Sequence, residues 1–385
     1  MAIPDTLKKI TMIAGGFQPQ YVVEVVNALA RAGAKVDLIG SEDFRGYKYD
    51  PGVKVLYYRG KVTTITDRIK RIFLYPIKLF IHSLHDESEV YHIQWCKNII
   101  LEGLMLCLYL KLIGKAVVYT AHNVLPHDKE HLLVNRVFYR LLYRTVNAII
   151  VHTESTKKEI IAYAGLPDAK VTVCEHGLYT MVNRLEKESA KKELGLKYKN
   201  IVLFFGALSH YKGVDILLKA IKEIRDSKDF DDSTGFVIAG RGLYGKDVDN
   251  ISREYKSVTP IVQYVDNSTA DRLFSAADCI VMPYRKIDQS GVLLLALSYG
   301  LPVIASNVGS FKDYIVDGRN GYIYEPNESH ALINAIKKFM AKNVWERDLI
   351  TADAYKKYSW NDIIVKYLKI YINVSAKGNI AGHAN

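Results

Sequence analysis

The sequence predicts two α/β domains, each built on a parallel, doubly wound sheet. Three observations support this prediction. The chain has 385 residues, more than a single hydrophobic core usually organises. Its opening reads as strand, glycine turn, helix and strand, the pattern of a βαβ unit. The alternation of strands and helices starts again at Asn200, after a stretch rich in Lys and Glu.

The first domain opens with the apolar strand Lys9–Ala14 and the turn Gly15-Gly16. Tyr21–Ala32 carries apolar side chains at helical spacing, and Gly33 is a typical helix end. Helices are also expected at Ile100–Leu112 and Leu132–Thr145. Further strands are expected at Lys35–Ile39, Val53–Tyr58, Val90–Ile93, Ala116–Tyr119, Ala148–Val151 and Lys170–Val173.

In the second domain the helix Val214–Ile224 follows the strand Asn200–Phe205. Later strands are expected at Gly235–Ala239, Ile261–Tyr264, Cys279–Met282 and Val303–Ala305. We therefore divide the chain into an N-terminal domain (1–184), a hinge (185–199), a C-terminal domain (200–358) and a C-terminal helix (359–374) that packs back towards the N-terminal domain.

Composition narrows the classes of partner. The net charge is +11 and the sequence pI is about 9.1, which favours acidic partners: nucleic acid, anionic lipid or phosphorylated substrates. The four cysteines have no Cys-x-x-Cys spacing, so neither a disulfide framework nor a zinc site is indicated, and a reducing compartment fits. The longest apolar run, Ile99–Ile113, contains Glu102 and Lys111 and predicts a core helix, not a membrane span.

The loop Asp288–Val292 is the most informative segment. It is polar, contains Gly291 and opens a buried apolar helix, so it predicts a helix start that binds an anion, most often a phosphate. Lys212-Gly213 follows the strand Asn200–Phe205, at the sheet edge where ligands bind, and Lys212 can contact phosphate oxygens as a point charge. The alternative for Lys212 is a solvated loop lysine.

Two further motifs carry weaker signals. Gly15-Gly16 would let the backbone approach a phosphate, or it is only a strand–helix turn. His122 follows the strand Ala116–Tyr119 and could reach a ligand, although a lone histidine is more often structural.

The segment 61–82 is basic and carries an apolar stripe at helical spacing, which is typical of a helix that lies on an anionic membrane surface. A helix that packs on its own domain and exposes a basic face is an equal alternative. Nucleic acid is not expected as a partner, because the basic residues lack interleaved aromatic side chains.

Taken together, these motifs resemble the retaining nucleotide-sugar glycosyltransferases of the GT-B fold, in glycosyltransferase group one and family four. The resemblance covers most of the chain and is strongest between Ile201 and Glu325. The motifs that carry it are Phe205-Gly206, Tyr211-Lys212-Gly213-Val214-Asp215, Ala276-Ala277-Asp278, Met282-Pro283-Tyr284, Gln289-Ser290-Gly291-Val292, Gly300-Leu301-Pro302-Val303-Ile304-Ala305 and Asn320-Gly321-Tyr322.

The resemblance implies two Rossmann-like domains that face a central cleft, with the donor in the second and the acceptor mainly in the first. It implies that Lys212 and Gly16 contact the donor diphosphate and that His122 lies beside the donor sugar. The remaining donor contacts that it implies are Val265 and Asp266 near the base, and Gln289, Ser290, Gly291 and Val292 under the phosphates.

The chain departs from the family pattern at three positions. Ala207 stands where the family often has an arginine, and Arg285 or Arg241 could replace that charge. Leu295 stands at the place of the second of two family glutamates. Asp288 lies next to the place of the first one, and we assign it that acidic role.

These features predict a metal-independent, cofactor-free enzyme in which Lys212 and the helix start at Gly291 stabilise the departing diphosphate. The expected reaction moves a hexose from a UDP- or GDP-sugar to a glycan or polyprenyl-diphosphate-linked acceptor in cell-surface polysaccharide synthesis. We expect a cytoplasmic protein, peripheral at the inner face of the membrane. Two alternatives stay open: a nucleotide-sugar epimerase of the same fold, and a non-catalytic partner in a glycan-assembly complex.

Overall fold

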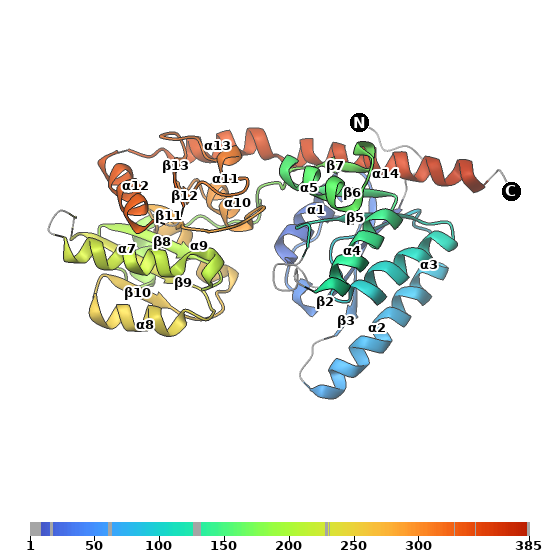
Figure 1. Cartoon of the computed structure of the whole chain (residues 1–385), viewed down its shortest axis with the longest axis horizontal. Coiled ribbons are helices and arrows are strands. Elements are labelled where there is room, and N and C mark those ends of the chain that lie inside the picture. Colours follow the sequence, from blue (N-terminus) through green and yellow to red (C-terminus); the bar gives the residue numbers. More distant parts are fainter. Residues whose placement is uncertain are drawn as a thin grey trace. The chain divides into compact units, whose positions relative to one another are not determined.

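A computed structural model describes residues 9–15, 18–60, 64–125, 132–227, 230, 232–326, 328–342 and 344–382, without the side chains of 66, 68–71, 73 and 376–382. The chain forms two compact units. The first comprises Met1–Gly177 and Tyr358–Asn385, and the second comprises Leu178–Lys357. Figure 1 shows the helices and strands of both units along the chain.

The first unit contains a seven-stranded parallel sheet in the order β3-β2-β1-β4-β5-β6-β7. This is the order of a doubly wound sheet, which changes winding direction beside β1. Its strands are β1 (Lys9–Ile13), β2 (Lys35–Ser41), β3 (Val53–Arg59), β4 (Val90–Ile93), β5 (Ala116–Thr120), β6 (Ala148–Val151) and β7 (Val171–Val173). They confirm the strands that the sequence predicted in this part of the chain.

Helices cover both faces of this sheet. On one face, α1 (Pro19–Arg31) packs against α14 (Trp360–Gly382). Four helical segments share the buried core of the other face. They are α2 (Ile65–His85), the π-helix η2 (Ile99–Met105) that continues as α3 (Leu106–Leu112), α4 (Leu133–Thr145) and α5 (Glu154–Ala164). Figure 1 shows α2, α3 and α4 as neighbours, and the contacts of α3 with both of the others agree.

The C-terminal helix is joined to the first unit by buried polar contacts. The hydroxyls of Tyr21 on α1 and Tyr367 on α14 are 2.8 Å apart, and Tyr371 lies 2.6 Å from Nδ1 of His92 on β4. The sequence placed this helix at 359–374, and the helix continues to Gly382.

The second unit repeats the topology with six parallel strands in the order β10-β9-β8-β11-β12-β13. They are β8 (Asn200–Phe205), β9 (Thr234–Ala239), β10 (Val258–Ile261), β11 (Cys279–Met282), β12 (Val303–Ser306) and β13 (Gly321–Tyr324). Its helices are α6 (Lys187–Glu193), α7 (Val214–Asp226), α8 (Gly245–Glu254), α9 (Asn267–Ala276), α10 (Gly291–Ser298), α11 (Phe311–Tyr314), α12 (Ser329–Ala341) and α13 (Arg347–Tyr358).

In this unit the structure differs from the sequence prediction in the bounds of one strand and in the place of the segment 185–199. The strand expected at Ile261–Tyr264 lies earlier, at β10, and includes Pro260. A proline is tolerated there because β10 is an edge strand, with β9 as its only neighbour in the sheet order. The segment 185–199, expected to be the hinge, belongs to the second unit: α6 packs on α9, and Lys187 pairs with Asp278 at 2.5 Å.

Among the described helices, none combines the length and the apolar character that crossing a bilayer requires. The run Ile99–Ile113 forms η2 and α3, and only part of it is core. Cys107 and Leu110 are fully buried, whereas Leu108 and Leu112 are exposed.

Gly240 permits a close approach of two backbone segments at the edge of the second sheet. It follows β9 with φ at 149°, a region that is essentially restricted to glycine. A Cβ at this position would overlap the carbonyl oxygen of Gly206, the residue that follows β8. By contrast, Gly318 has φ at 74° and open space around the position of a Cβ.

We therefore expect Gly240→Ala to lower the free energy of unfolding by about 3 kcal/mol or more. The alanine would have to adopt a strained φ, and the backbone at Gly206 would have to move to make room for its Cβ. The control Gly318→Ala adds only a left-handed φ and should cost about 1–2 kcal/mol. Urea unfolding of both variants measures the difference. Equal losses would contradict the close approach.

Candidate functional site

Lys212 lies at the carboxyl edge of the second sheet, in the short 3₁₀ turn η4 (His210–Lys212) between β8 and α7. Gly213 follows with φ at 68°, and a Cβ there would overlap the carbonyl oxygen of Pro283. This packing draws the turn against the loop after β11. The sequence alternative of a solvated lysine is wrong, because Lys212 is only 7% exposed.

The Lys212 ammonium lies in an aromatic and mainly apolar setting. Its Nζ is 3.8 Å from the ring centroid of Tyr284 and 5.4 Å from that of Tyr211. Burial lowers the pKa of Lys212 to about 8. No carboxylate pairs with it among the residues that the structure describes. A desolvated cation without a counter-charge is costly, and an anionic ligand would remove that cost.

Arg285 braces this turn and does not lie free for a ligand. Its guanidinium donates to both carboxylate oxygens of Asp215, at 2.7 and 2.6 Å, and to the carbonyl of His210 at 2.7 Å. The hydrogen bonds from Arg285 lower the pKa of Asp215. The sequence predicted that Arg285 or Arg241 supplies the charge of a missing donor arginine, and this stays a prediction: in the free protein Arg285 is bound by Asp215 and the His210 carbonyl.

The start of α10 faces the same region. The carbonyl of Ser290 accepts from Leu293 and Leu294 at 3.1 and 3.4 Å, while the first N–H groups of a helix have no acceptor inside it. Three nearby polar atoms are buried without a hydrogen-bond partner of normal geometry among the described residues. They are the hydroxyls of Tyr284 and Ser290 and the amide nitrogen of Gln289.

An unmade hydrogen bond costs about 1–3 kcal/mol, so the buried amide nitrogen of Gln289 favours a polar ligand here, whereas the hydroxyls of Tyr284 and Ser290 interact with each other. Burial also raises the pKa of Tyr284, while the neighbouring Ser290 hydroxyl acts in the opposite direction. Lys212, Ser290 and Gly291 were expected at such a site from the sequence. Tyr284 was missed as a member, since an aromatic after a strand reads as core.

The residues expected near a base lie at the end of β10. Asp266 caps α9: its carboxylate accepts from the backbone of Thr269 at 2.9 Å and from its hydroxyl at 3.0 Å. Val265 is half-buried beside it. The sequence missed Tyr264, which is 72% exposed and has the Arg241 guanidinium 5.6 Å from its ring centroid. Asp288, in the loop before α10, is half-buried.

In the first unit, the glycine turn after β1 is only partly described. Gly16 lies outside the described residues. The carbonyl of Gly15 accepts a hydrogen bond from Arg59, a fully buried side chain that also lies 3.5 Å from Glu102. The Arg59 guanidinium is 5.3 Å from the ring centroid of Tyr75 on α2. Sequence reasoning missed this buried arginine beneath the turn.

His122 belongs to a cluster of four buried histidines at the carboxyl ends of β4 to β7, with His92, His152 and His176. The ring of Tyr21 lies among three of them, with centroid distances of 5.3 Å to His122, 5.4 Å to His152 and 4.5 Å to His176. Nδ1 of His152 lies 2.8 Å from the carbonyl of Cys174, so that nitrogen carries the proton.

The cluster is neutral at physiological pH. Burial, with the repulsion of His152 second, lowers the pKa of His122 well below its ordinary value. Burial likewise lowers the pKa to about 3 for His92 and His176 and to about 4 for His152. A neutral imidazole can orient a hydroxyl through a hydrogen bond but cannot supply a positive charge.

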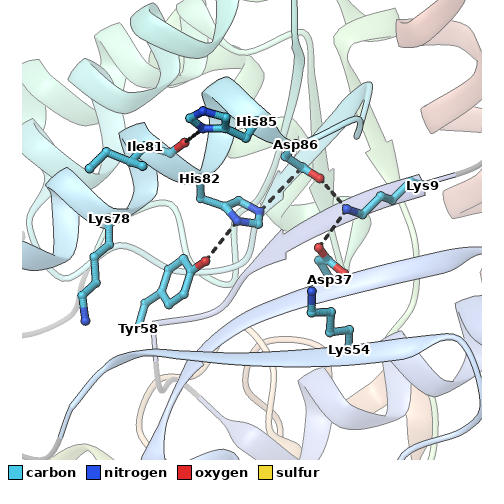
Figure 2. A pocket seen from close by; sticks show the side chains of 9 residues that line it. All are labelled: Lys9, Asp37, Lys54, Tyr58, Lys78, Ile81, His82, His85 and Asp86. Atoms are coloured by element: carbon cyan, nitrogen blue, oxygen red, sulfur yellow. Dashed lines mark hydrogen bonds and ion pairs between the residues drawn. The ribbon is translucent and has the colours of Figure 1, made fainter.

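A cavity of about 500 Å³ lies between α2 and the strands β1 to β3 of the first unit (Figure 2). Within it, Asp37, His82 and Asp86 offer ligand atoms within 4.8 Å of one another, a spacing that could hold a metal ion. However, the ammonium of Lys9 already lies 2.9 Å from Asp37 and 2.6 Å from Asp86. A side-chain cation therefore compensates these two carboxylates.

Comparisons with known proteins cover both units. Residues 186–358 match the family Glycosyl transferases group 1, and residues 18–180 match Glycosyltransferase Family 4. The chain is 23% identical over 256 residues to an uncharacterized glycosyltransferase of Methanocaldococcus jannaschii. It is 27% identical over 206 residues to a GDP-mannose:glycolipid 4-beta-D-mannosyltransferase of Xanthomonas campestris.

The two alignments span 64% and 52% of this chain, and 64% and 53% of the relatives' own length. The structural likeness is more extensive. A crystal structure of an Anabaena protein in complex with UDP and glucose superposes with a TM-score of 0.70 at 16% identity, over 94% of this chain and 99% of that one.

The histidine cluster makes the first unit sensitive to acid. His92, His152 and His176 stay neutral when folded but ionise below about pH 6.5 when unfolded. Each should therefore lower the free energy of unfolding by about 1.4 kcal/mol per pH unit as pH falls from 6.5 to 4. Urea unfolding between pH 7.5 and pH ~5 measures this slope.

The variant His152→Asn keeps a donor for the Cys174 carbonyl and cannot titrate. This variant should reduce the slope by about 1.4 kcal/mol per pH unit, the contribution of one titrating group. An unchanged slope would show that His152 does not titrate in this way.

Proposed function

Since both units of the chain belong to glycosyltransferase families and the chain has the GT-B fold that the sequence predicted, we propose that it transfers a hexose from a UDP- or GDP-sugar to a glycan or lipid-linked acceptor. The observation that carries this proposal is Lys212, a buried ammonium without a counter-charge among the described residues, next to unpaired polar atoms at the start of α10.

In this proposal the donor diphosphate is bound by Lys212 and by the first backbone N–H groups of α10, at Gly291 and Val292. The ammonium supplies a point charge and the helix start supplies aligned dipoles. The Gln289 amide gains the hydrogen bond that it lacks in the free protein, and the Ser290 hydroxyl gains a better-aligned one. Binding of the diphosphate also restores the ordinary pKa of Lys212, because the anion favours the charged form.

The nucleoside part extends towards the end of β10. Val265 offers its backbone beside the base, and the exposed ring of Tyr264 offers a face on which a base can stack. The Asp266 side chain acts indirectly, by fixing the start of α9. Asp288 takes the acidic role towards the sugar hydroxyls that the family gives to a glutamate.

We propose transfer with retention of configuration. The bond from the anomeric carbon to the diphosphate oxygen breaks, the acceptor oxygen forms its bond on the same face, and the acceptor proton passes to the departing phosphate. Lys212 and the α10 dipole stabilise the charge that develops on the leaving group. Because both groups are already oriented before the reaction, they need no rearrangement during it. Neutral His122 orients the donor sugar, and Gly16 contributes a backbone contact to the diphosphate.

The acceptor belongs to cell-surface polysaccharide synthesis and is carried on a lipid such as a polyprenyl diphosphate. This part rests on the basic composition of the chain and on the segment 61–82. The similar enzyme of Xanthomonas campestris, whose name specifies a glycolipid acceptor, supports it. The protein would then act at the inner face of the membrane, on its cytoplasmic side.

We expect Lys212→Ala to lower the turnover number about 10²–10³-fold, the usual cost of removing one group that stabilises developing charge. Donor consumption with UDP- and GDP-sugars provides the measurement, and circular dichroism checks that the variant is folded. The matched control is Lys219→Ala on α7, a lysine whose side chain is 72% exposed. Turnover within about twofold of the parent in Lys212→Ala would sink the assignment.

We expect EDTA to leave the transfer rate unchanged, because Lys212 and α10 supply the positive charge in place of a divalent ion. Among the described residues, the group with metal-ligand spacing is Asp37, His82 and Asp86, in the first unit. A loss of activity that magnesium restores would contradict the metal-free mechanism.

A further inference from the structure

Tyr179, in the segment between β7 and α6, packs against the helix α10. It belongs to the second unit and is only 8% exposed. Its backbone N–H donates to the hydroxyl of Ser298 on α10 at 3.0 Å, and its carbonyl accepts from the hydroxyl of Tyr355 on α13 at 3.1 Å. Hydrogen bonds to two helices therefore fix the backbone of Tyr179.

The side chain of Tyr179 extends along α10 towards its start. Gly291 and Ser298 are the first and last of the eight residues of this helix, almost two turns apart and so on the same face. The backbone of Tyr179 lies at Ser298, whereas its hydroxyl lies 2.9 Å from the position that a Cβ of Gly291 would occupy. The side chain therefore spans this face of the helix from its end to its first residue.

This close approach explains why a glycine stands at position 291. Gly291 is helical and does not have a positive φ, so its backbone conformation would accept other residues. The restriction is space, because a methyl group there would meet the Tyr179 hydroxyl. Since the Cα–Cβ bonds of a helix tilt towards its N-terminus, the hydroxyl lies on the side to which the first N–H groups of α10 point.

The groups around this helix start are hydrogen-bond donors of the kind that bind a phosphate. They include the buried ammonium of Lys212, the buried amide of Gln289 and the first backbone N–H groups of α10. The phenol hydroxyl of Tyr179 adds a further donor at the same place. Hydrogen bonds to an ionised acceptor are about twice as strong as neutral ones, so an oxyanion is the ligand that these donors fit.

We propose that the Tyr179 hydroxyl donates a hydrogen bond to a phosphate oxygen of the bound nucleoside diphosphate, beside the N–H of Gly291. This inference rests on the proposed function and adds a diphosphate-binding residue from outside the loops that carry Lys212 and Gln289. Because α10 and α13 both hold the Tyr179 backbone, the side chain is oriented before the donor binds, which lowers the entropy cost of the contact.

The test is calorimetry of the full-length chain with UDP and GDP. The variant Tyr179→Phe removes the hydroxyl but keeps the ring and both backbone hydrogen bonds, so its urea midpoint should stay close to that of the parent. Its affinity for the nucleoside diphosphate that the parent binds should fall about tenfold or more, the usual loss for one hydrogen bond to a charged group. Affinity for the matching nucleoside, measured by competition, should be unchanged, because the nucleoside carries no phosphate.

Tyr255→Phe is the matched control. It removes another tyrosine hydroxyl of the second unit, one that donates to Asp226 at 3.2 Å. Tyr255 precedes β10 and so lies near the amino edge of the sheet, away from Lys212 and the start of α10. This variant should bind UDP and GDP like the parent.

Gly291→Ala tests the close approach itself. Its methyl group should push the Tyr179 hydroxyl aside and weaken diphosphate binding in the parent, with little further effect in the Tyr179→Phe background. Equal losses in the two backgrounds would overturn the placement of the hydroxyl at the helix start.

Two outcomes would overturn the role of Tyr179 alone. One is parent-like affinity of Tyr179→Phe for the nucleoside diphosphate. The other is an equal loss for the diphosphate and the nucleoside, since that would show a change of the whole site and not of a phosphate contact. A parent protein that binds neither UDP nor GDP would instead overturn the proposed function, and this inference with it.

Discussion

In both sheets every strand pairs in parallel with its neighbours, and this constraint decides where polar chemistry can lie. Parallel strands deliver all their carboxyl ends to one edge, where loops leave a buried core and begin the next helix. Lys212, Ser290, His122, His152 and His176 all lie on the segments that follow a strand, and His92 lies next to the carboxyl end of β4.

The two units treat buried ionisable groups in opposite ways. In the second unit, Lys212 is a buried cation that lies over the ring of Tyr284, close to polar atoms that lack partners. Such a setting favours an anionic ligand. In the first unit, burial removes the charge from the histidines, and hydrogen bonds such as that of His152 to Cys174 fix the tautomer. The first arrangement leaves polar atoms without partners around a cation, whereas the second is held mainly by contacts within the protein.

Most strands of both sheets and part of the candidate site could be predicted from the sequence, because strand ends, glycines and helix starts are local signals. Lys212 and Ser290 were found in that way. The partners of Arg285 and Asp266 were not, since each depends on which loops meet in space: Asp215 holds Arg285, and a local cap occupies Asp266. The histidine cluster was missed for the same reason, because its members are far apart in sequence and meet only when β4 to β7 align.

The discontinuous first unit has a consequence for synthesis of the chain. Its last helix, α14, is translated after the whole of the second unit, yet it supplies Tyr367 and Tyr371 to contacts with Tyr21 and His92. A growing chain on the ribosome therefore exposes the α1 face of the first sheet until α14 emerges. The second unit, which is continuous, can finish folding first, and the order of completion is the reverse of the order of translation.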